Sequence, residues 1–302
     1  NVATLDRLRP GDEVIVPALS WSTTVWPIIQ LGLVPVIVDI DPVTFNIDPN
    51  EVERAIGPKT RGLMPVHVYG NPCAIEEIES LSKKYNLKVI YDAAHCFGVK
   101  FKDKSIFNYG DVSTCSFHAT KIFHTGEGGA LFCQSDEVFH EMWYRHNFGH
   151  NGQEKYHGLG INAKMNELQA AMGLCVLPYM THIINERKRI CEYYTRNLNF
   201  LKMNKIKIRS NTEWNYAYYP IIFSSEKILL EIKNKLEKER IFTRRYFYPS
   251  LTKLPYVDFA ETPIADDIAS RVLCLPLYIE LTEYNCKKIV KIINSHFEAQ
   301  SV

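Results

Sequence analysis

The sequence has no pair of cysteines at the Cys-x-x-Cys spacing typical of zinc and redox motifs, although it contains eight cysteines in 302 residues. The cysteines are scattered, and several lie inside apolar runs. This distribution favours buried free thiols in a reducing cytoplasm over a disulfide framework, and no metal site is expected. The cysteines occupy positions 73, 96, 115, 133, 175, 191, 274 and 286.

The chain also lacks an excess of charge of one sign, a long apolar run, internal repeats and low-complexity tracts. Its formal net charge is +1, which provides no bulk attraction to nucleic acid or to an anionic membrane surface. No apolar run is long enough to span a bilayer. We therefore expect neither nucleic acid nor a membrane as a partner. The length and the ordinary apolar content suit one large domain with a smaller companion.

The chain begins with Asn1 and opens on a helix-like pattern, Val2 to Leu8, which Pro10-Gly11 ends. A natural chain normally starts with Met and seldom starts inside a secondary-structure element. We therefore expect an N-terminal segment to be missing from this sequence.

Strands and helices alternate along the first half of the chain. This order predicts a mostly parallel α/β sheet. An N-cap, a first-turn proline and an acidic residue in Asp48-Pro49-Asn50-Glu51 mark one helix start. The predicted strands cover residues 13–17, 34–39, 62–68, 87–91, 113–117 and 130–133, and the predicted helices include 23–31, 74–85, 136–147 and 166–180.

The last third of the chain has a different pattern. It contains predicted strands at 216–223 and 242–248 and predicted helices at 226–239 and 283–298. This pattern is typical of a small α+β domain, and the boundary is expected in the helical stretch 175–200. We place a large domain at residues 1–185 and a small C-terminal domain at residues 186–302.

Residues 113–132 form a predicted strand, a polar loop and a second strand, with Lys121 on the loop between apolar neighbours. Desolvation lowers the pKa of an amine and exposes its lone pair, so Lys121 is a candidate Schiff-base lysine. Ser116 and Thr120 could provide hydroxyl donors to a phosphate. The alternative is an ordinary hairpin with a solvated lysine at its bend.

Three further residues follow strands whose carboxyl ends should meet at one edge of the sheet, namely Trp21, Asp92 and His95. An indole can stack on a flat heteroaromatic ring, and a carboxylate can keep a ring nitrogen protonated. Together with Lys121, these groups suit pyridoxal phosphate. Taken singly, Trp21 could be a core aromatic, Asp92 a helix cap and His95 a satisfied polar residue.

Several longer motifs run along the chain. They are Gly11-Asp-Glu-Val-Ile-Val-Pro17, Val38-Asp-Ile-Asp41, Pro65-Val-His-Val-Tyr-Gly-Asn-Pro72, Tyr91-Asp-Ala-Ala-His-Cys-Phe-Gly98, Ser116-Phe-His-Ala-Thr-Lys121, Glu127-Gly-Gly129 and Gly160-Ile-Asn-Ala-Lys-Met-Asn-Glu-Leu-Gln-Ala-Ala171. In combination these motifs resemble the DegT/StrS family of sugar-nucleotide aminotransferases, which are fold-type-I pyridoxal-phosphate enzymes similar to aspartate aminotransferase. The resemblance covers most of residues 10–200, and more loosely 244–250 and 271–277.

The resemblance implies catalytic roles for three residues. Lys121 matches the Schiff-base lysine, and Asp92 matches the partner of the pyridinium nitrogen. His95 matches the residue beside the phenolic oxygen of the cofactor, a position that is often Gln.

Three more positions match cofactor-binding residues. Ser116 matches a phosphate-binding hydroxyl, and Trp21 matches the aromatic residue that stacks on the ring. Asn162 matches an asparagine that reaches the phosphate of the neighbouring subunit, which implies a homodimer with shared active sites.

The implied reaction moves an amino group from glutamate to C4 or C3 of a nucleotide-linked keto-6-deoxyhexose, for bacterial surface polysaccharide such as O-antigen. Candidate contacts for the diphosphate are Lys155, Lys164, Arg244 and Arg245. The phosphate-binding turn expected before Asn1 is absent, so a catalytically impaired scaffold subunit is one alternative. A dehydratase of the same fold is another, because Leu19 to Thr24 also resembles that branch. The dehydratases have histidine at the lysine position, so Lys121 favours transamination.

Overall fold

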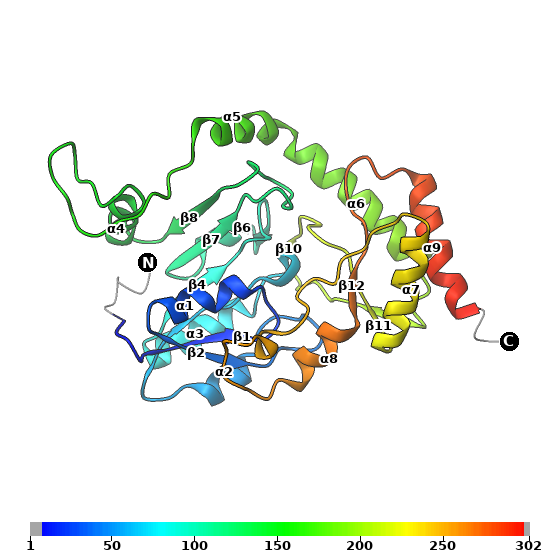
Figure 1. Ribbon diagram of the computed structural model, residues 1–302, viewed down its shortest axis with the longest axis horizontal. Helices are drawn as coiled ribbons and strands as arrows, with labels where there is room; N and C mark the ends of the chain where they lie inside the picture. The colour runs from blue at the N-terminus through cyan, green and yellow to red at the C-terminus, as the bar shows by residue number, and fades with distance from the viewer. Residues whose placement is uncertain (1–7, 299–302) are drawn as a thin grey trace.

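A six-stranded sheet forms the centre of the N-terminal half in the computed structural model, which describes residues 8–298 (Figure 1). Its strands run in the order β2-β1-β3-β4-β7-β8, and all neighbours are parallel except β7 and β8. This sheet confirms the predicted α/β class. The strands are β1 (Glu13–Pro17), β2 (Val34–Val38), β3 (Thr60–Leu63), β4 (Lys88–Asp92), β7 (Val112–Ser116) and β8 (Gly129–Cys133).

Both faces of the sheet are buried at its centre, and alternate residues of β1 show why. Val14 and Val16 belong to one hydrophobic cluster, whereas Ile15 belongs to another. Successive side chains of a strand point to opposite faces, so an all-apolar strand needs cover on both sides. The second cluster includes residues of α2 (Pro49–Ala55) and α3 (Ile75–Tyr85). Residues of α1 (Trp26–Gln30) and of the C-terminal third complete the first.

The C-terminal third forms a smaller antiparallel sheet, ordered β12-β11-β9, with helices packed against it. These elements lie on the right of Figure 1. The proposed division after residue 185 would fall inside α6, and it stays a prediction. The elements are α6 (Met180–Asn197), β9 (Met203–Lys205), β11 (Pro220–Phe223), α7 (Glu226–Lys238), α8 (Pro263–Arg271), β12 (Val272–Cys274) and α9 (Glu283–Glu298).

Three expected strands are wrong in extent or kind. The strand expected over 216–223 begins only at Pro220, after Tyr216 with a φ of 56°. The strand expected over 62–68 ends at Leu63, and a turn with Tyr69 at φ 56° follows. The expected strand 242–248 is irregular, with a single bridge between Arg244 and Cys274. Phe247 has a φ of 66°, and this left-handed backbone conformation is incompatible with a continuing strand. Pattern reading also missed α8 and β12.

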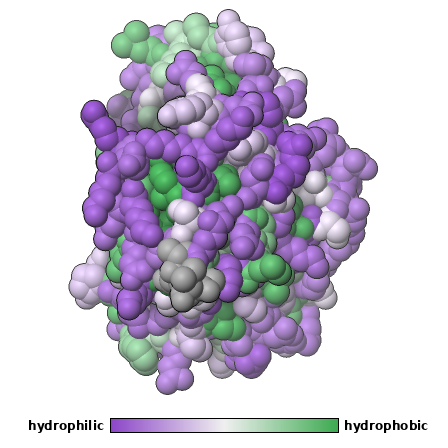
Figure 2. Space-filling model, turned by 90° about the vertical axis from the view of Figure 1, so that its right-hand side faces the viewer, coloured by the Kyte–Doolittle hydropathy of each residue, from purple (hydrophilic) through white to green (hydrophobic). Residues whose placement is uncertain are grey.

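A long excursion separates α4 (Asp136–His146) from α5 (Glu167–Val176) and projects from the body at the upper left of Figure 1. The helix expected over 166–180 is α5 followed by a 3-10 turn at Leu177–Tyr179. Apolar side chains on α5 are exposed, Leu168 by 83% and Leu174 by 72%. Hydrophobic groups gather at the top of Figure 2, the end of the molecule where α5 lies.

The helix expected over Val2 to Leu8 falls outside the described residues, except for Leu8 itself. Three very short strands, β5 (Lys100–Phe101), β6 (Lys104–Ser105) and β10 (Thr212–Glu213), pair in a further sheet that joins the two halves of the chain. Between residues 8 and 298, no helix has both the length and the apolar character needed to cross a membrane.

Asp39 fastens the C-terminal third to the end of β2. Its buried carboxylate accepts hydrogen bonds from the backbone N–H groups of Ile264 at 2.8 Å and Ala265 at 2.8 Å, at the start of α8. Helix N-termini favour negative charge and have N–H groups without partners in the helix.

We predict that Asp39→Asn lowers the free energy of unfolding by about 1 to 3 kcal/mol, because one acceptor oxygen becomes an amide that cannot accept. Urea denaturation followed by circular dichroism measures this change. Asp258→Asn, at an exposed position, is the matched control and should leave the midpoint unchanged. Equal midpoints for both variants would show that the Asp39 contacts do not contribute.

Candidate active site

A cleft of about 300 Å³ opens at the carboxyl ends of the parallel strands. The chain leaves β1 for β2 on one side and returns to β3 on the other, so connections diverge there and leave a crevice. Each central strand supplies residues just beyond its end, and the C-terminal third supplies the remaining wall. The lining includes Trp21 after β1, His67 after β3, Asp92 and His95 at β4, Ser116, Thr120 and Lys121 after β7, and Arg244, Tyr246 and Phe247.

Lys121 lies on the loop between β7 and β8, and its amine points into this cleft. Backbone hydrogen bonds close the loop, among them Phe117 N–H to the Gly128 carbonyl at 2.9 Å. Ile122 and Phe123 anchor it in the core. The Nζ atom donates to the Tyr246 hydroxyl at 3.3 Å. Desolvation lowers the pKa of Lys121, the charge of Asp92 opposes this shift, and the nearby Arg244 adds to it. Lys121 is therefore not the solvated hairpin lysine of the alternative reading.

Asp92 ends β4 at the floor of the cleft. Its Oδ1 accepts a hydrogen bond from the Ala94 N–H at 3.0 Å, and within residues 8–298 no hydrogen bond reaches Oδ2. Desolvation raises the pKa of this carboxyl, while the Ala94 N–H and the Lys121 charge counteract the rise. A protonated ring nitrogen would stabilise the carboxylate further, because it would both donate to Oδ2 and carry positive charge.

His95 is buried beside Lys121 and is held as a neutral ring. Desolvation lowers its pKa well below the usual value, and the charges of Lys121 and Arg244 act in the same direction. Its Nδ1 accepts from the Tyr69 N–H at 3.2 Å, so in the neutral ring Nε2 carries the proton. The Nε2 atom lies 3.1 Å from the Tyr246 hydroxyl.

Trp21 and Ser116 both line the cleft. The Trp21 ring is 47% exposed and lies 5.9 Å from the Tyr246 ring, so one indole face is available to a flat ligand. Ser116 ends β7, and its Oγ accepts a long hydrogen bond from the His118 N–H at 3.3 Å. The cleft thus brings together Trp21, Asp92, His95, Ser116 and Lys121, as the sequence predicted.

Asn162 does not line this cleft in its own chain. It lies on the excursion before α5, where its Oδ1 accepts from Lys164 at 2.8 Å. Of the four candidate diphosphate contacts, only Arg244 lines the cleft. Arg245 is paired with Glu226 at 2.6 Å instead.

Several residues of the cleft were not predicted as site residues, among them His67 and Tyr246. His67 follows β3 and was expected inside a strand, which hid its position at the edge of the sheet. Its Nδ1 accepts from the Cys73 N–H at 2.9 Å, and its buried Nε2 has no partner in the described chain. Tyr246 arrives from a segment 125 residues beyond Lys121, and no local pattern connects the two.

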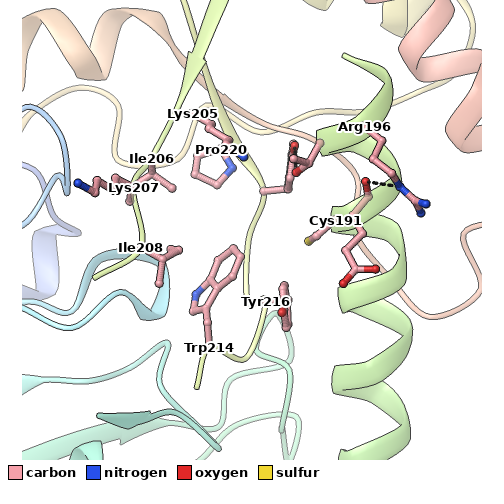
Figure 3. Close-up of a pocket in the computed structure, with 12 residues that line it drawn as sticks. Cys191, Arg196, Lys205, Ile206, Lys207, Ile208, Trp214, Tyr216 and Pro220 are labelled. Carbon is pink, nitrogen blue, oxygen red and sulfur yellow. Dashed lines mark hydrogen bonds between the residues drawn. The ribbon is translucent and has the colours of Figure 1, made fainter. Parts of the chain in front are cut away.

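A larger cavity of about 540 Å³ lies elsewhere, between α6 and the segment 205–220 (Figure 3). Aromatic and aliphatic side chains line it, with Trp214, Tyr216 and Ile208 facing Cys191 across the opening in Figure 3. None of the predicted site residues contributes to it. The smaller cleft, where a half-buried amine and a carboxylate converge, is therefore the candidate active site.

Comparison with known proteins identifies the family of this chain. The model of the DegT/DnrJ/EryC1/StrS aminotransferase family matches residues 3–294. The chain belongs to this family. The resemblance drawn from the sequence motifs is thereby confirmed, and so is the expectation of an aminotransferase.

Individual relatives match along nearly the whole chain. A dTDP-4-amino-4,6-dideoxy-D-glucose transaminase of Shigella dysenteriae is 42% identical, over 97% of this chain and 82% of the relative. A GDP-perosamine synthase of Escherichia coli O157:H7 is 33% identical, over 96% and 80%. The structure of DesI in the presence of its TDP-sugar product is 29% identical and superimposes with a TM-score of 0.88, over 96% and 78%.

The cleft fits the cofactor that the sequence predicted. It provides a desolvated amine at Lys121, an open carboxylate oxygen at Asp92 and an exposed indole face at Trp21. His67, whose buried Nε2 has no partner within the described residues, also lines this cleft. These groups match an aldehyde, a ring nitrogen and a flat ring in one ligand.

His67 makes the stability of this edge depend on pH. Burial and the charge of Arg209 lower its pKa to about 3, so the folded state excludes a proton that the unfolded state binds. The free energy of unfolding is therefore unaffected by the titration of His67 above pH 6.5, the ordinary pKa of a histidine, and it decreases as the pH falls from 6.5 toward 3.

We predict that the slope of unfolding free energy between pH 6.5 and 5 falls by about 1 kcal/mol per pH unit in His67→Asn. The asparagine oxygen can still accept from the Cys73 N–H, so the fold is retained. Urea titrations at several pH values measure the slope, with His140→Asn on exposed α4 as control. An unchanged slope in the His67 variant would contradict this assignment.

Proposed function

We propose that this chain is a pyridoxal-phosphate-dependent transaminase that moves an amino group from glutamate to the keto carbon of a nucleotide-linked keto-6-deoxyhexose. The observation that carries the proposal is the half-buried Lys121 amine, directed into a cleft that Asp92, His95 and Trp21 also line. The identity to the Shigella transaminase supports C4 of a dTDP-linked sugar as the amination site. Such products suit surface polysaccharide synthesis.

Pyridoxal phosphate would supply an electrophilic aldehyde and an electron-accepting ring. Lys121 would hold the cofactor through Nζ, and its freed amine would accept and return the proton of the amino donor. Asp92 would keep its negative charge against the ring nitrogen. His95 would lie beside the phenolic oxygen, and Trp21 would cover the ring and exclude water from one face.

The anionic groups of the ligands have separate candidates. Ser116 and Thr120 line the cleft together with Lys121. Their hydroxyl groups suit the cofactor phosphate. Arg244 suits the substrate diphosphate, because its guanidinium has no carboxylate partner among the described residues and lines the cleft. No observation favours the dehydratase or the scaffold alternative.

A homodimer with shared active sites is part of the proposal. The exposed apolar side chains of α5 support it, because a monomer seldom leaves residues such as Leu168 and Leu174 uncovered together. Asn162 lies on the adjoining excursion and outside its own cleft, which is where a residue that serves the partner's cleft would lie. Cytoplasmic location is also proposed, and the eight unpaired cysteines support it.

Lys121→Ala should abolish the visible absorbance band that forms with pyridoxal phosphate and should lower transamination by about a thousandfold or more, because no other group replaces its amine. The spectrum before and after addition of glutamate measures both binding and the first half-reaction. Keto-sugar nucleotides can then be screened by return of the colour. Lys83→Ala, on the exposed face of α3, is the control. A variant without Lys121 that still transfers nitrogen would refute the proposal.

Shared sites predict complementation between two inactive variants. We expect a heterodimer of Lys121→Ala and Asn162→Ala chains, purified with two different tags, to have about half of wild-type activity, because one site receives both intact residues. Each variant homodimer should be strongly impaired. If the sites are not shared, each site of the heterodimer carries one lesion and the activity stays low.

A further inference from the structure

The hydroxyl oxygen of Tyr246 contacts both Lys121 and His95. The Oη atom of Tyr246 accepts a hydrogen bond from Lys121 Nζ at 3.3 Å and lies 3.1 Å from His95 Nε2. We propose that Tyr246 is a positioning residue for the Lys121 amine, which it holds in place and couples to His95. This inference rests on the proposed function of Lys121.

The hydrogen-bond accounting gives the direction of each contact. His95 Nδ1 accepts a hydrogen bond from the Tyr69 N–H, so the single ring proton of neutral His95 is on Nε2. Nε2 donates a hydrogen bond through this proton to Tyr246 Oη. Lys121 donates to the same oxygen. A phenol oxygen has two acceptor lone pairs, so it can accept both of these hydrogen bonds. Tyr246 thus fixes the distance between the amine and the imidazole.

Neighbouring side chains and backbone hydrogen bonds hold the Tyr246 ring firmly in place. Its side chain is only 4% exposed, and its ring packs against Phe247 at 4.3 Å and Tyr218 at 4.9 Å between ring centroids. The Tyr69 hydroxyl donates to the Tyr246 carbonyl at 3.1 Å. Two backbone hydrogen bonds between Arg244 and Cys274 fix the start of the segment. A rigid acceptor of this kind can orient a lysine, whose four-carbon stem is flexible.

The contact also affects the charge of the amine. A hydrogen bond to the charged form of a group favours that form, so the Tyr246 oxygen stabilises the Lys121 ammonium. Removal of the hydroxyl should therefore increase the fraction of neutral amine at a given pH. It should at the same time leave the amine less well oriented, so reactivity toward a small reagent and catalytic rate should move in opposite directions.

The first experiment needs no cofactor. Cofactor-free wild type and Tyr246→Phe are labelled with trace acetic anhydride between pH 6 and 10, and mass spectrometry quantifies the Lys121 peptide. We expect labelling at pH 7 to rise roughly three- to tenfold in Tyr246→Phe, with the pH profile displaced to lower pH. Tyr248→Phe, two residues along and outside the cleft, is the matched control and should label like wild type.

The second experiment measures the glutamate half-reaction with pyridoxal phosphate bound. We expect the rate constant for loss of the visible band to fall about tenfold in Tyr246→Phe, with nearly unchanged cofactor affinity. Tyr246→Leu removes the ring as well and separates packing from the hydroxyl.

The outcomes distinguish this inference from the proposed function. Wild-type labelling in Tyr246→Phe, a shift that occurs only in Tyr246→Leu, or an equal shift in Tyr248→Phe would each overturn the positioning role. If the labelling shift occurs but wild-type protein forms no visible band with pyridoxal phosphate, the contact exists and the proposed function fails. A labelling shift together with slower glutamate turnover supports both.

Discussion

The site depends on the partial desolvation of one amine and on the charges that offset it. A lysine in water stays protonated at neutral pH, whereas burial of Lys121 favours its neutral form and Asp92 limits the change. The charge of Arg244 repels the same ammonium and also favours the neutral form. The balance requires Lys121, Asp92 and Arg244 to stay close, although they come from β7, β4 and the C-terminal third. The fold holds these three charged groups close to one another.

The parallel sheet meets this requirement through geometry. Strand ends share an edge, so a polar residue placed just after each strand reaches the same cleft without a dedicated linker. The chain passes from β1 to β2 on one side and then to β3 on the other, and the diverging connections leave space above that edge. The apolar strands beneath it are buried on both faces and resist displacement. Precise placement of the polar groups therefore follows from the rigidity of the sheet.

Much of the site could be predicted from the sequence because these residues sit at strand ends or on one loop. Asp92 and Ser116 end their strands, Trp21 follows β1 and Lys121 lies on the loop after β7. The order of elements brings such ends together. His67 was missed because the apolar run around it was extended beyond Leu63. Residues 242–248 were assigned to a strand because aromatic residues favour strands, but the left-handed backbone at Phe247 overrides that preference. Tertiary contacts, including the Tyr69 hydrogen bond to the Tyr246 carbonyl, help stabilise this irregular segment.

The irregular segment is also what makes the C-terminal third part of the site. A regular strand would alternate its side chains between two faces, whereas the turn at Phe247 lets Tyr246 and Phe247 stack at 4.3 Å and line the same cleft. Arg244, Tyr246 and the Asp39 anchor of α8 then connect this third to the parallel sheet at separate points. The amine of Lys121 can reach its described geometry only when both parts of the chain are docked. Folding of the C-terminal third and assembly of the site are in this sense a single event.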